Sequence, residues 1–362
     1  MFVASNSHKK NIISIVLLDL APQGGVRVII NIANKLADSG YDIHIYASRK
    51  PKNMPFSISP KVKVHYASRV RNKVLAFYIY PFILPFILTG NIFISTFYYI
   101  RLPTKLASYL KNAQHFYFIQ GVECFRRGGP FNLLNFLCKF SLHDKNLFTS
   151  NRYLSKEVFN KVGRNVQSIR VGPSSIFFNK GLSLEKKEFD LIYFARREKF
   201  KRLDLFIDLF NNKEFISKKW KTIVVTLDTE LVMDLKNMGL PGCTIISPSN
   251  DDQLISLIDK SKLMFFTSDY EGLGLPPLEC MLRGVPVVTY KTYPLTEYFN
   301  NKKLLNLLID DTFSAVREIN RILLSPKLHS NYSEFCKEFV EKEFSENYAL
   351  DFLNFIQNPK EF

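Results

Sequence analysis

Two carboxylates, Glu271 and Glu279, stand eight positions apart in the segment EGLGLPPLE. An apolar run at 263–266 precedes the segment, and the strand-like run 285–290 follows it. Two prolines in the segment suit a first helical turn, so the sequence predicts a strand, a loop, a helix and a second strand. Such a loop lies at the carboxyl end of a parallel strand, where amides at a helix start can face an anion. With carboxylates beside it that bind hydroxyls, this loop suits a sugar nucleotide.

Two cations, Arg196 and Lys201, lie in a basic loop at 196–202 that follows a predicted strand at 189–194. Cations at a strand end can offset the charge that develops on a departing nucleoside diphosphate, so no divalent ion is required. The alternative is that both are solvated surface cations. For Glu271 the alternative is a solvated loop acid, and for Glu279 it is an acid that stabilises the first turn of a helix.

A glycine pair, Gly24 and Gly25, follows the apolar run 12–18 and precedes apolar residues at helical spacing. Residues 42–47 then have the pattern of a second strand, so the chain is predicted to open with a βαβ unit. Phosphate-binding loops occur at this position. Glycines also serve ordinary turns, so both interpretations stay open.

Composition limits the class of protein. The 362 residues are enough for two domains, and 46% hydrophobic with 23% charged residues indicates a folded chain. A net charge of +16 favours anionic partners such as nucleotides, an anionic membrane surface or nucleic acid. Five scattered cysteines without a C-x-x-C pair suggest neither a disulfide framework nor a zinc site, which fits the cytoplasm. Residues 12–18 are interpreted as a first buried strand rather than a signal peptide.

The fold class expected from the alternation of apolar runs and helical segments is α/β, with a parallel, doubly wound sheet in each half. The segment Gly172-Pro173-Ser174-Ser175 is a plausible hinge between the halves. We therefore expect domains at 1–172 and 173–343, followed by a terminal helix within 344–362. Further strands are expected at 91–99, 114–119, 147–150, 169–171, 222–227, 244–246 and 263–267.

The most hydrophobic stretch of the chain is residues 74–88, which follow several basic residues. Fifteen residues with two internal prolines fall short of the roughly 20 that a membrane-spanning helix needs. Two interpretations stay open: a buried core element of the first domain, or a basic, aromatic surface that lies on anionic lipid headgroups.

Three segments, in this order, resemble signatures of the retaining glycosyltransferases of the GT-B fold, family 4, also called glycosyl transferases group 1. The resemblance covers nearly the whole chain. Its fold would be two Rossmann-like domains facing a central cleft, with the terminal helix crossing back to the first domain. The matching segments are 24–28 with 36–42, then 194–196 with 201–205, and finally Glu271 to Glu279 with 283–288.

The resemblance implies roles for individual residues. Arg196 and Lys201 would bind the donor diphosphate, Glu271 would lie by the donor sugar, and Glu279 would bind the ribose hydroxyls. Glu123, in the segment Gln120-Gly121-Val122-Glu123, would be an acceptor-side base. The chain departs from the family pattern at Ala195 and at Pro173-Ser174-Ser175, where no ligand contact is assigned. The predicted donor-binding set also contains Gly24, Gly25, Gly272, Leu273, Gly274 and Leu275.

The resemblance also implies an activity. A hexose or deoxyhexose would pass from a nucleoside diphosphate sugar to a cell-surface glycan or lipid-linked acceptor, with no metal and no cofactor beyond that donor substrate. The enzyme would be cytoplasmic and peripheral at the inner face of the membrane. The alternative is a protein of this fold that binds a membrane surface or an anionic polymer without turnover. Nucleic acid is not expected as a partner, and the base, sugar, acceptor and linkage stay open.

Overall fold

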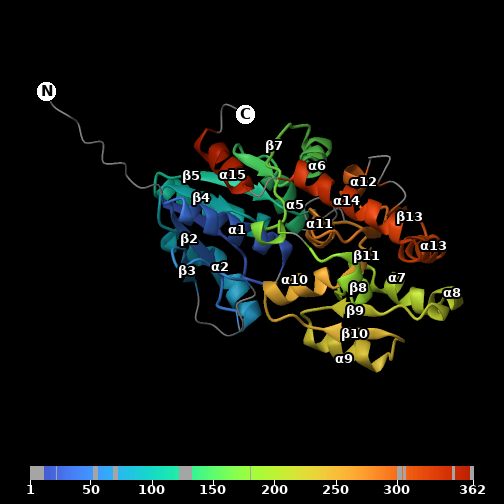
Figure 1. Cartoon of the computed structure of the whole chain (residues 1–362). Coiled ribbons are helices and arrows are strands. Elements are labelled where there is room, and N and C mark those ends of the chain that lie inside the picture. Colours follow the sequence, from blue (N-terminus) through green and yellow to red (C-terminus); the bar gives the residue numbers. More distant parts are fainter. Residues whose placement is uncertain are drawn as a thin grey trace. The chain divides into compact units, whose positions relative to one another are not determined.

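The strands of the chain form two parallel sheets in the computed structural model (Figure 1). By its internal contacts the chain divides into two units, Met1–Val171 with Asn347–Phe362, and Gly172–Glu346. The division falls at the first residue of the predicted hinge, and the terminal segment belongs to the first unit. The structure describes residues 12–21, 23–51, 56–67, 72–121, 133–179, 181–299, 304, 307–344 and 347–358.

The first unit is built on a seven-stranded sheet with the strand order β3-β2-β1-β4-β5-β6-β7. All of its pairs are parallel, and Ile13 of β1 stands beside Ile43 on one side and Ile92 on the other. Except at the two edges of the sheet, the strands are largely apolar, as expected for a sheet covered on both faces. They are β1 (Ile12–Val16), β2 (Asp42–Ala47), β3 (Lys63–Tyr66), β4 (Ile92–Ser95), β5 (Gln114–Ile119), β6 (Leu147–Thr149) and β7 (Gln167–Ser168).

The direction of each crossover decides which face of this sheet a helix covers. Crossovers between parallel strands are right-handed, so the helices after β3, β4 and β5 belong on one face, because these crossovers run the same way along the sheet. The helix after β1 belongs on the other face. The helices are α1 (Gly24–Asp38), α2 (Lys73–Ile87), α3 (Tyr98–Leu110), α5 (Leu133–Ser141), α6 (Arg152–Val162) and α15 (Tyr348–Gln357).

The terminal helix α15 completes the core of the first unit. It packs against α1, and its Phe352 ring meets the ring of Phe118 edge-on at 5.5 Å. The Phe355 ring lies 4.6 Å from that of Phe148. The last helix in the sequence therefore buries aromatic rings against β5 and β6 of the first unit.

The second unit is built on a six-stranded sheet with the strand order β10-β9-β8-β11-β12-β13. Its strands are β8 (Phe189–Phe194), β9 (Thr222–Val225), β10 (Cys243–Ile246), β11 (Ser261–Phe266), β12 (Val287–Tyr290) and β13 (Leu308–Ile309). Its helices are α7 (Leu203–Asp208), α8 (Lys213–Ser217), α9 (Thr229–Asn237), α10 (Asp251–Asp259), α11 (Leu275–Leu282), α12 (Leu295–Tyr298), α13 (Thr312–Leu323) and α14 (Pro326–Glu343), with short 3₁₀ turns η1 (Ser175–Phe177), η2 (Leu184–Lys186), η3 (Lys199–Lys201) and η4 (Leu209–Asn211).

Both sheets reverse their strand order once, between β1 and β4 in the first unit and between β8 and β11 in the second. The doubly wound α/β prediction is therefore confirmed. Ligands of such sheets bind at the carboxyl ends of the strands on either side of the reversal. These two positions are where the site residues must be sought.

Two local predictions need correction, and one stretch had no predicted secondary structure. The predicted strand at 91–99 is too long, because β4 ends at Ser95 and α3 begins at Tyr98. The strand predicted at 169–171 lies earlier, at Gln167–Ser168. Residues 74–88 form most of the helix α2, although Pro81 and Pro85 lie inside it. Each internal proline removes a helical hydrogen bond, yet the helix continues through both.

Candidate functional site

Residues from two of the predicted motifs meet at the carboxyl ends of β8 and β11. These strands are parallel neighbours at the reversal of the second sheet. The loop after β8 carries Arg196 and Lys201, and the loop after β11 carries Glu271. The Nζ of Lys201 donates a hydrogen bond to Oε1 of Glu271 at 2.6 Å, across 70 positions of the sequence.

The Lys201–Glu271 ion pair is shielded from solvent. The side chains of Lys201 and Glu271 are 22% and 12% exposed, so water screens the pair less than it screens a surface ion pair. The solvated-surface alternatives for these two residues are therefore wrong. Arg196 is half-buried on the same loop as Lys201.

Backbone contacts hold the two loops together around this ion pair. The hydroxyl of Thr267 donates to the carbonyl of Lys201 at 2.7 Å, and the N–H of Asp269 donates to the carbonyl of Phe200 at 2.8 Å. Since the Thr267 proton is used in this way, the hydroxyl of Tyr193 must donate to Thr267 across their 2.9 Å contact. These contacts fix the backbone of the two loops, and the hydrogen bond to Glu271 holds the end of the Lys201 side chain.

An aromatic stack that sequence reasoning missed adds to this contact. The rings of Phe200 and Tyr270 stack at 4.6 Å, and each residue precedes a member of the ion pair. Beside the stack, Arg202 donates to Asp204 and to Asp269. In the sequence, the sign of their importance was that Phe200 and Arg202 flank Lys201 and that Tyr270 precedes Glu271. Together with Lys199, these residues line a surface depression.

The loop from Gly272 to Leu275 leads into α11. Gly274 has a φ of +77° at the N-cap of that helix, a left-handed conformation that favours glycine. Two prolines occupy the first turn of α11 and have no N–H. An anion held at this loop would therefore meet amides of Gly272, Leu273, Gly274 and Leu275, because the next two positions are the prolines.

Glu279 lies in the second turn of α11 and is 3% exposed. The first turn of α11 contains no acidic residue, so the helix-stabilising alternative for Glu279 is wrong. Burying a carboxylate is costly unless other groups satisfy it. Its role in binding ribose hydroxyls stays a prediction.

The glycine pair occupies the corresponding position of the first unit. Gly24 and Gly25 are the first two residues of α1, directly after the loop from β1. A Cβ on Gly25 would lie 3.4 Å from Oε1 of Gln120, which follows β5. Among the described residues this oxygen is buried and accepts no hydrogen bond. A Cβ at position 25 would therefore make an ordinary contact with Gln120, so this approach does not require glycine. Glu123 lies outside the described residues.

The described part of the chain contains neither a candidate metal site nor a helix that could span a membrane. There, no group of three or more His, Cys, Asp or Glu side chains is arranged to hold a metal ion. No described helix combines the length and apolarity needed to cross a bilayer. Metal independence stays a prediction.

Solved structures of known proteins share the fold over nearly the whole chain. Sucrose-phosphate synthase from Thermosynechococcus elongatus superimposes with a TM-score of 0.73 at 13% identity, covering 96% of this chain and 99% of that one. Anabaena Alr3699/HepE in complex with UDP-glucose gives 0.73 at 14% identity, covering 96% and 100%. A mutant of S. aureus TarM in complex with Fondaparinux, alpha-GlcNAc-glycerol and UDP gives 0.73 at 13%, covering 95% and 99%. The chain therefore has the GT-B fold.

Sequence comparison places the second unit in a family. Residues 175–339 match the family described as "Glycosyl transferases group 1", so this unit belongs to that family. A curated relative, the alpha-1,3/1,6-mannosyltransferase ALG2 of Rhizomucor pusillus, is 28% identical over 96 residues. That alignment covers 26% of this chain and 21% of the relative. The GT-B fold and the group 1 family predicted from the sequence are both confirmed.

Proposed function

We propose that this protein is a glycosyltransferase that moves a hexose or deoxyhexose from a nucleoside diphosphate sugar to an acceptor hydroxyl, with retention of configuration. The observation that carries the proposal is the Lys201–Glu271 ion pair at the sheet reversal of the family-matched unit. A cation and a carboxylate held by two adjoining strand-end loops suit a donor whose diphosphate and sugar lie side by side.

In the proposed reaction, the bond between the anomeric carbon and the diphosphate oxygen breaks. Arg196, Lys201 and the loop amides stabilise the negative charge that develops on the diphosphate, as preorganised donors do in other transfers. The acceptor hydroxyl attacks the same face of the sugar, and its proton passes to the departing phosphate oxygen. Glu271 lies by the sugar and, through its bond to Lys201, keeps the ammonium in place. No metal or cofactor takes part.

Two structural neighbours support the choice of the first donor to test. They are complexes with UDP-glucose or UDP, so UDP is the first nucleotide to test. The proposed acceptor is a cell-surface glycan or a lipid-linked saccharide. An enzyme with such an acceptor would work in the cytoplasm, peripherally at the inner face of a membrane, and would not use nucleic acid.

The test is a titration of the full chain with UDP, GDP, dTDP and ADP and with the corresponding sugars. Binding is measured by calorimetry and by the shift in melting temperature, which rises when a ligand binds the folded state. We expect one nucleotide to stabilise the protein and its sugar to be turned over when an acceptor is supplied. No binding by any nucleotide would refute the proposal.

The second candidate is a protein that binds a membrane surface or an anionic polymer without turnover. The net charge of +16 and the apolar residues exposed on α2 favour it. It predicts binding that falls with salt, together with no affinity for nucleotides. The nucleotide titration therefore separates the two candidates.

A further inference from the structure

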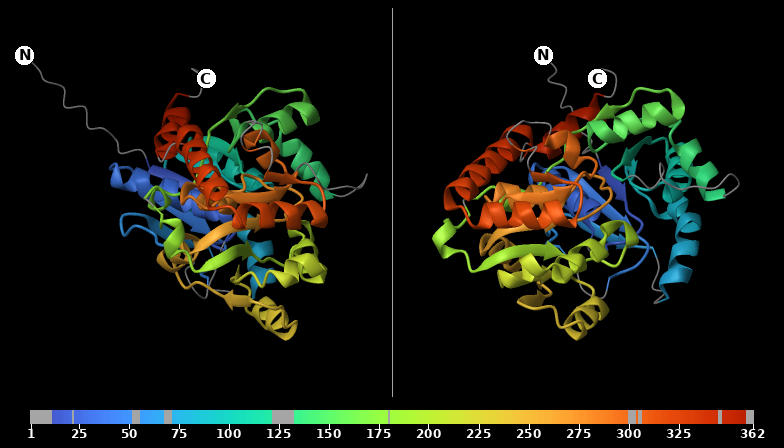
Figure 2. Two further views of the ribbon diagram at one scale, coloured as in Figure 1. Left: turned by 45° about the vertical axis from the view of Figure 1, so that its right-hand side comes forward. Right: turned by 90° about the vertical axis from the view of Figure 1, so that its right-hand side faces the viewer.

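Three helices of the first unit, α2, α3 and α5, expose an unusual amount of apolar surface. Among the described residues, 22 large hydrophobic side chains are exposed, and 11 of them lie on these helices. α2 packs against α3, and α3 packs against α5 (Figure 2). Since the crossover directions put all three helices on one face of the sheet, their exposed side chains form one surface, here called the α2–α3–α5 face.

The helix α2 has two apolar sides. Ala76, Tyr80 and Leu84 are fully buried in the core of the first unit. Phe82 and Phe86 are 77% and 79% exposed. Neither sequence interpretation of residues 74–88 was complete, because one side of the helix is core and the other is an apolar surface.

The exposed stripe continues on the neighbouring helices. Leu102, Leu106 and Leu110 are exposed and spaced four residues apart, which places them on one side of α3. On α5 the exposed rings of Phe136 and Phe140 stack at 6.1 Å. Contiguous exposed apolar surface of this kind marks an interaction site rather than ordinary protein surface.

The charge of this region is entirely positive. From residue 43 to residue 122 the sequence contains 11 Lys or Arg residues and no Asp or Glu. α5 also lacks an acidic residue. Lys139, which precedes Phe140 in the sequence, is exposed. Lys111, directly after α3, donates to the backbone carbonyl of Phe86 at 3.1 Å.

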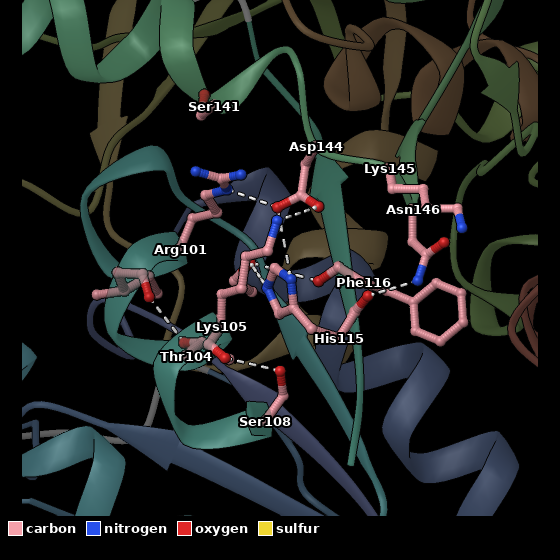
Figure 3. Close-up of polar contacts among 12 residues, drawn as sticks. Arg101, Thr104, Lys105, Ser108, His115, Phe116, Ser141, Asp144, Lys145 and Asn146 are labelled. Atoms are coloured by element: carbon pink, nitrogen blue, oxygen red, sulfur yellow. Dashed lines mark hydrogen bonds and ion pairs between the residues drawn. The ribbon is translucent and has the colours of Figure 1, made fainter. Parts of the chain in front are cut away.

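The acid nearest to α5 in the described sequence, Asp144, is hidden and neutralised (Figure 3). It is 2% exposed, and Nε of Arg101 donates to it at 2.5 Å. Lys105 approaches its other oxygen at 3.4 Å. The guanidinium of Arg101 also lies over the ring of Phe140, 5.2 Å from its centre. This network joins α3 to α5 and the loop after it, so it fixes the shape of the α2–α3–α5 face. Because one carboxylate pairs with two cations, the network keeps a net positive charge.

We propose that the α2–α3–α5 face docks on an anionic lipid bilayer. Its aromatic rings enter the boundary between headgroups and acyl chains, while its lysines contact the phosphates, as in interfacial helices. A second copy of the chain fits this face poorly, because cations would meet cations. The inference deepens the proposed function. It rests on that function for one point, the lipid-linked acceptor, which would lie in the bilayer on which this face docks.

The test is flotation of the full chain with vesicles of phosphatidylglycerol and phosphatidylcholine, compared with vesicles of phosphatidylcholine alone. We expect binding to the anionic vesicles that falls with salt. The double variant Phe82→Ser/Phe86→Ser should lower this partitioning at least about tenfold, since each ring loses apolar contact with the lipid. Lys139→Glu should lower binding to anionic vesicles.

The control is the double variant Phe313→Ser/Leu324→Ser, which replaces exposed side chains of the second unit. It should partition like the wild type, and all variants should keep the wild-type melting temperature. Equal partitioning of the Phe82→Ser/Phe86→Ser variant and the wild type would overturn the inference. So would a dimer, seen by light scattering, that this variant dissociates while no vesicles are bound.

Nucleotide titration without vesicles keeps this inference separate from the proposed function. The Phe82→Ser/Phe86→Ser variant should bind the nucleotide as the wild type does. Nucleotide binding without vesicle binding contradicts only the docking surface. Vesicle binding that the variant loses, in a protein that binds no nucleotide, supports the surface and contradicts only the transferase.

Discussion

Lys201 and Glu271 form a largely buried ion pair of 2.6 Å that joins the loops after two adjoining strands of the second unit. The same two strands carry a second ion pair at their opposite ends, between Lys262 of β11 and Asp190 of β8 at 2.8 Å. Lys262 is therefore a matched control for Lys201. It differs in lying at the amino ends of the strands, where doubly wound sheets do not bind ligands.

Replacing Glu271 by Gln should leave the fold intact and remove most of the activity. The amide oxygen can accept a hydrogen bond from Lys201, but it carries no negative charge, so the electrostatic attraction that holds the ammonium in place is lost. We expect turnover of the nucleotide sugar to fall by two or more decades, the scale of a lost preorganised charge contact. Circular dichroism and steady-state rates measure the two effects. Unchanged turnover would refute the role of Glu271.

Gly274→Ala should destabilise the second unit. A residue with a Cβ in the left-handed conformation costs about 1 to 2 kcal/mol, and here the Cβ would also approach Leu295 to 3.2 Å. The control is Gly239→Ala, because Gly239 has a φ of +59° with nothing within 4 Å of the added atom. Urea unfolding should show a larger loss for Gly274→Ala than for Gly239→Ala. Equal losses of unfolding free energy would contradict the prediction, because they would mean that the contact with Leu295 adds no cost.

Acidification should destabilise the first unit through His115. Burial lowers the pKa of His115 to about 4, although Asp144 opposes the shift. Since the unfolded residue titrates near pH 6.5, the unfolded state binds the extra proton between these values, and stability falls as the pH falls. The loss from His115 should be about 2 kcal/mol between pH 7.5 and pH 5.

The variant His115→Asn should be less stable than the wild type at neutral pH but should depend less on pH in this window. Burial also lowers the pKa values of His44, His65 and His329, so part of the dependence should remain. His143→Asn replaces an exposed histidine and should keep the full dependence. An unaltered pH profile in His115→Asn would contradict the assignment.

Phe352→Ala should destabilise the first unit strongly. Phe352 is fully buried against Phe118 and Phe148, and truncating a core phenylalanine costs about 3 to 5 kcal/mol. Phe313→Ala removes a ring that is 66% exposed and should change stability by less than about 0.5 kcal/mol. Removing the residues after Glu343 should also destabilise the first unit. A stable and fully active truncated chain would contradict the role of α15.

Strands that are buried on both faces were predictable from the sequence. The predicted bounds of β2, β5 and β8 agree with the structure to the residue, because polar residues or turns end these apolar runs. The edge strand β3 was missed. It is four residues long, with Lys63 exposed and the others half-buried, so its sequence lacks a continuous apolar run.

Tertiary contacts decided what the sequence left open. The motifs placed Lys201 and Glu271 at one predicted site, but their hydrogen bond depends on β8 lying next to β11, a property of strand order. For α2 both sides are apolar, so periodicity could not show which side faces the core. The neighbouring helix α3 and the sheet determine that Tyr80 is buried and Phe82 is exposed.

The most direct test compares Lys201→Ala with Lys262→Ala in a transfer assay with the nucleotide sugar that binds. Lys201→Ala should lose at least about two decades of turnover while it stays folded by circular dichroism, since it removes a charge contact to the leaving group. Lys262→Ala should turn over the sugar at the wild-type rate. Equal rates for Lys201→Ala and the wild type would contradict a donor site at the ends of β8 and β11.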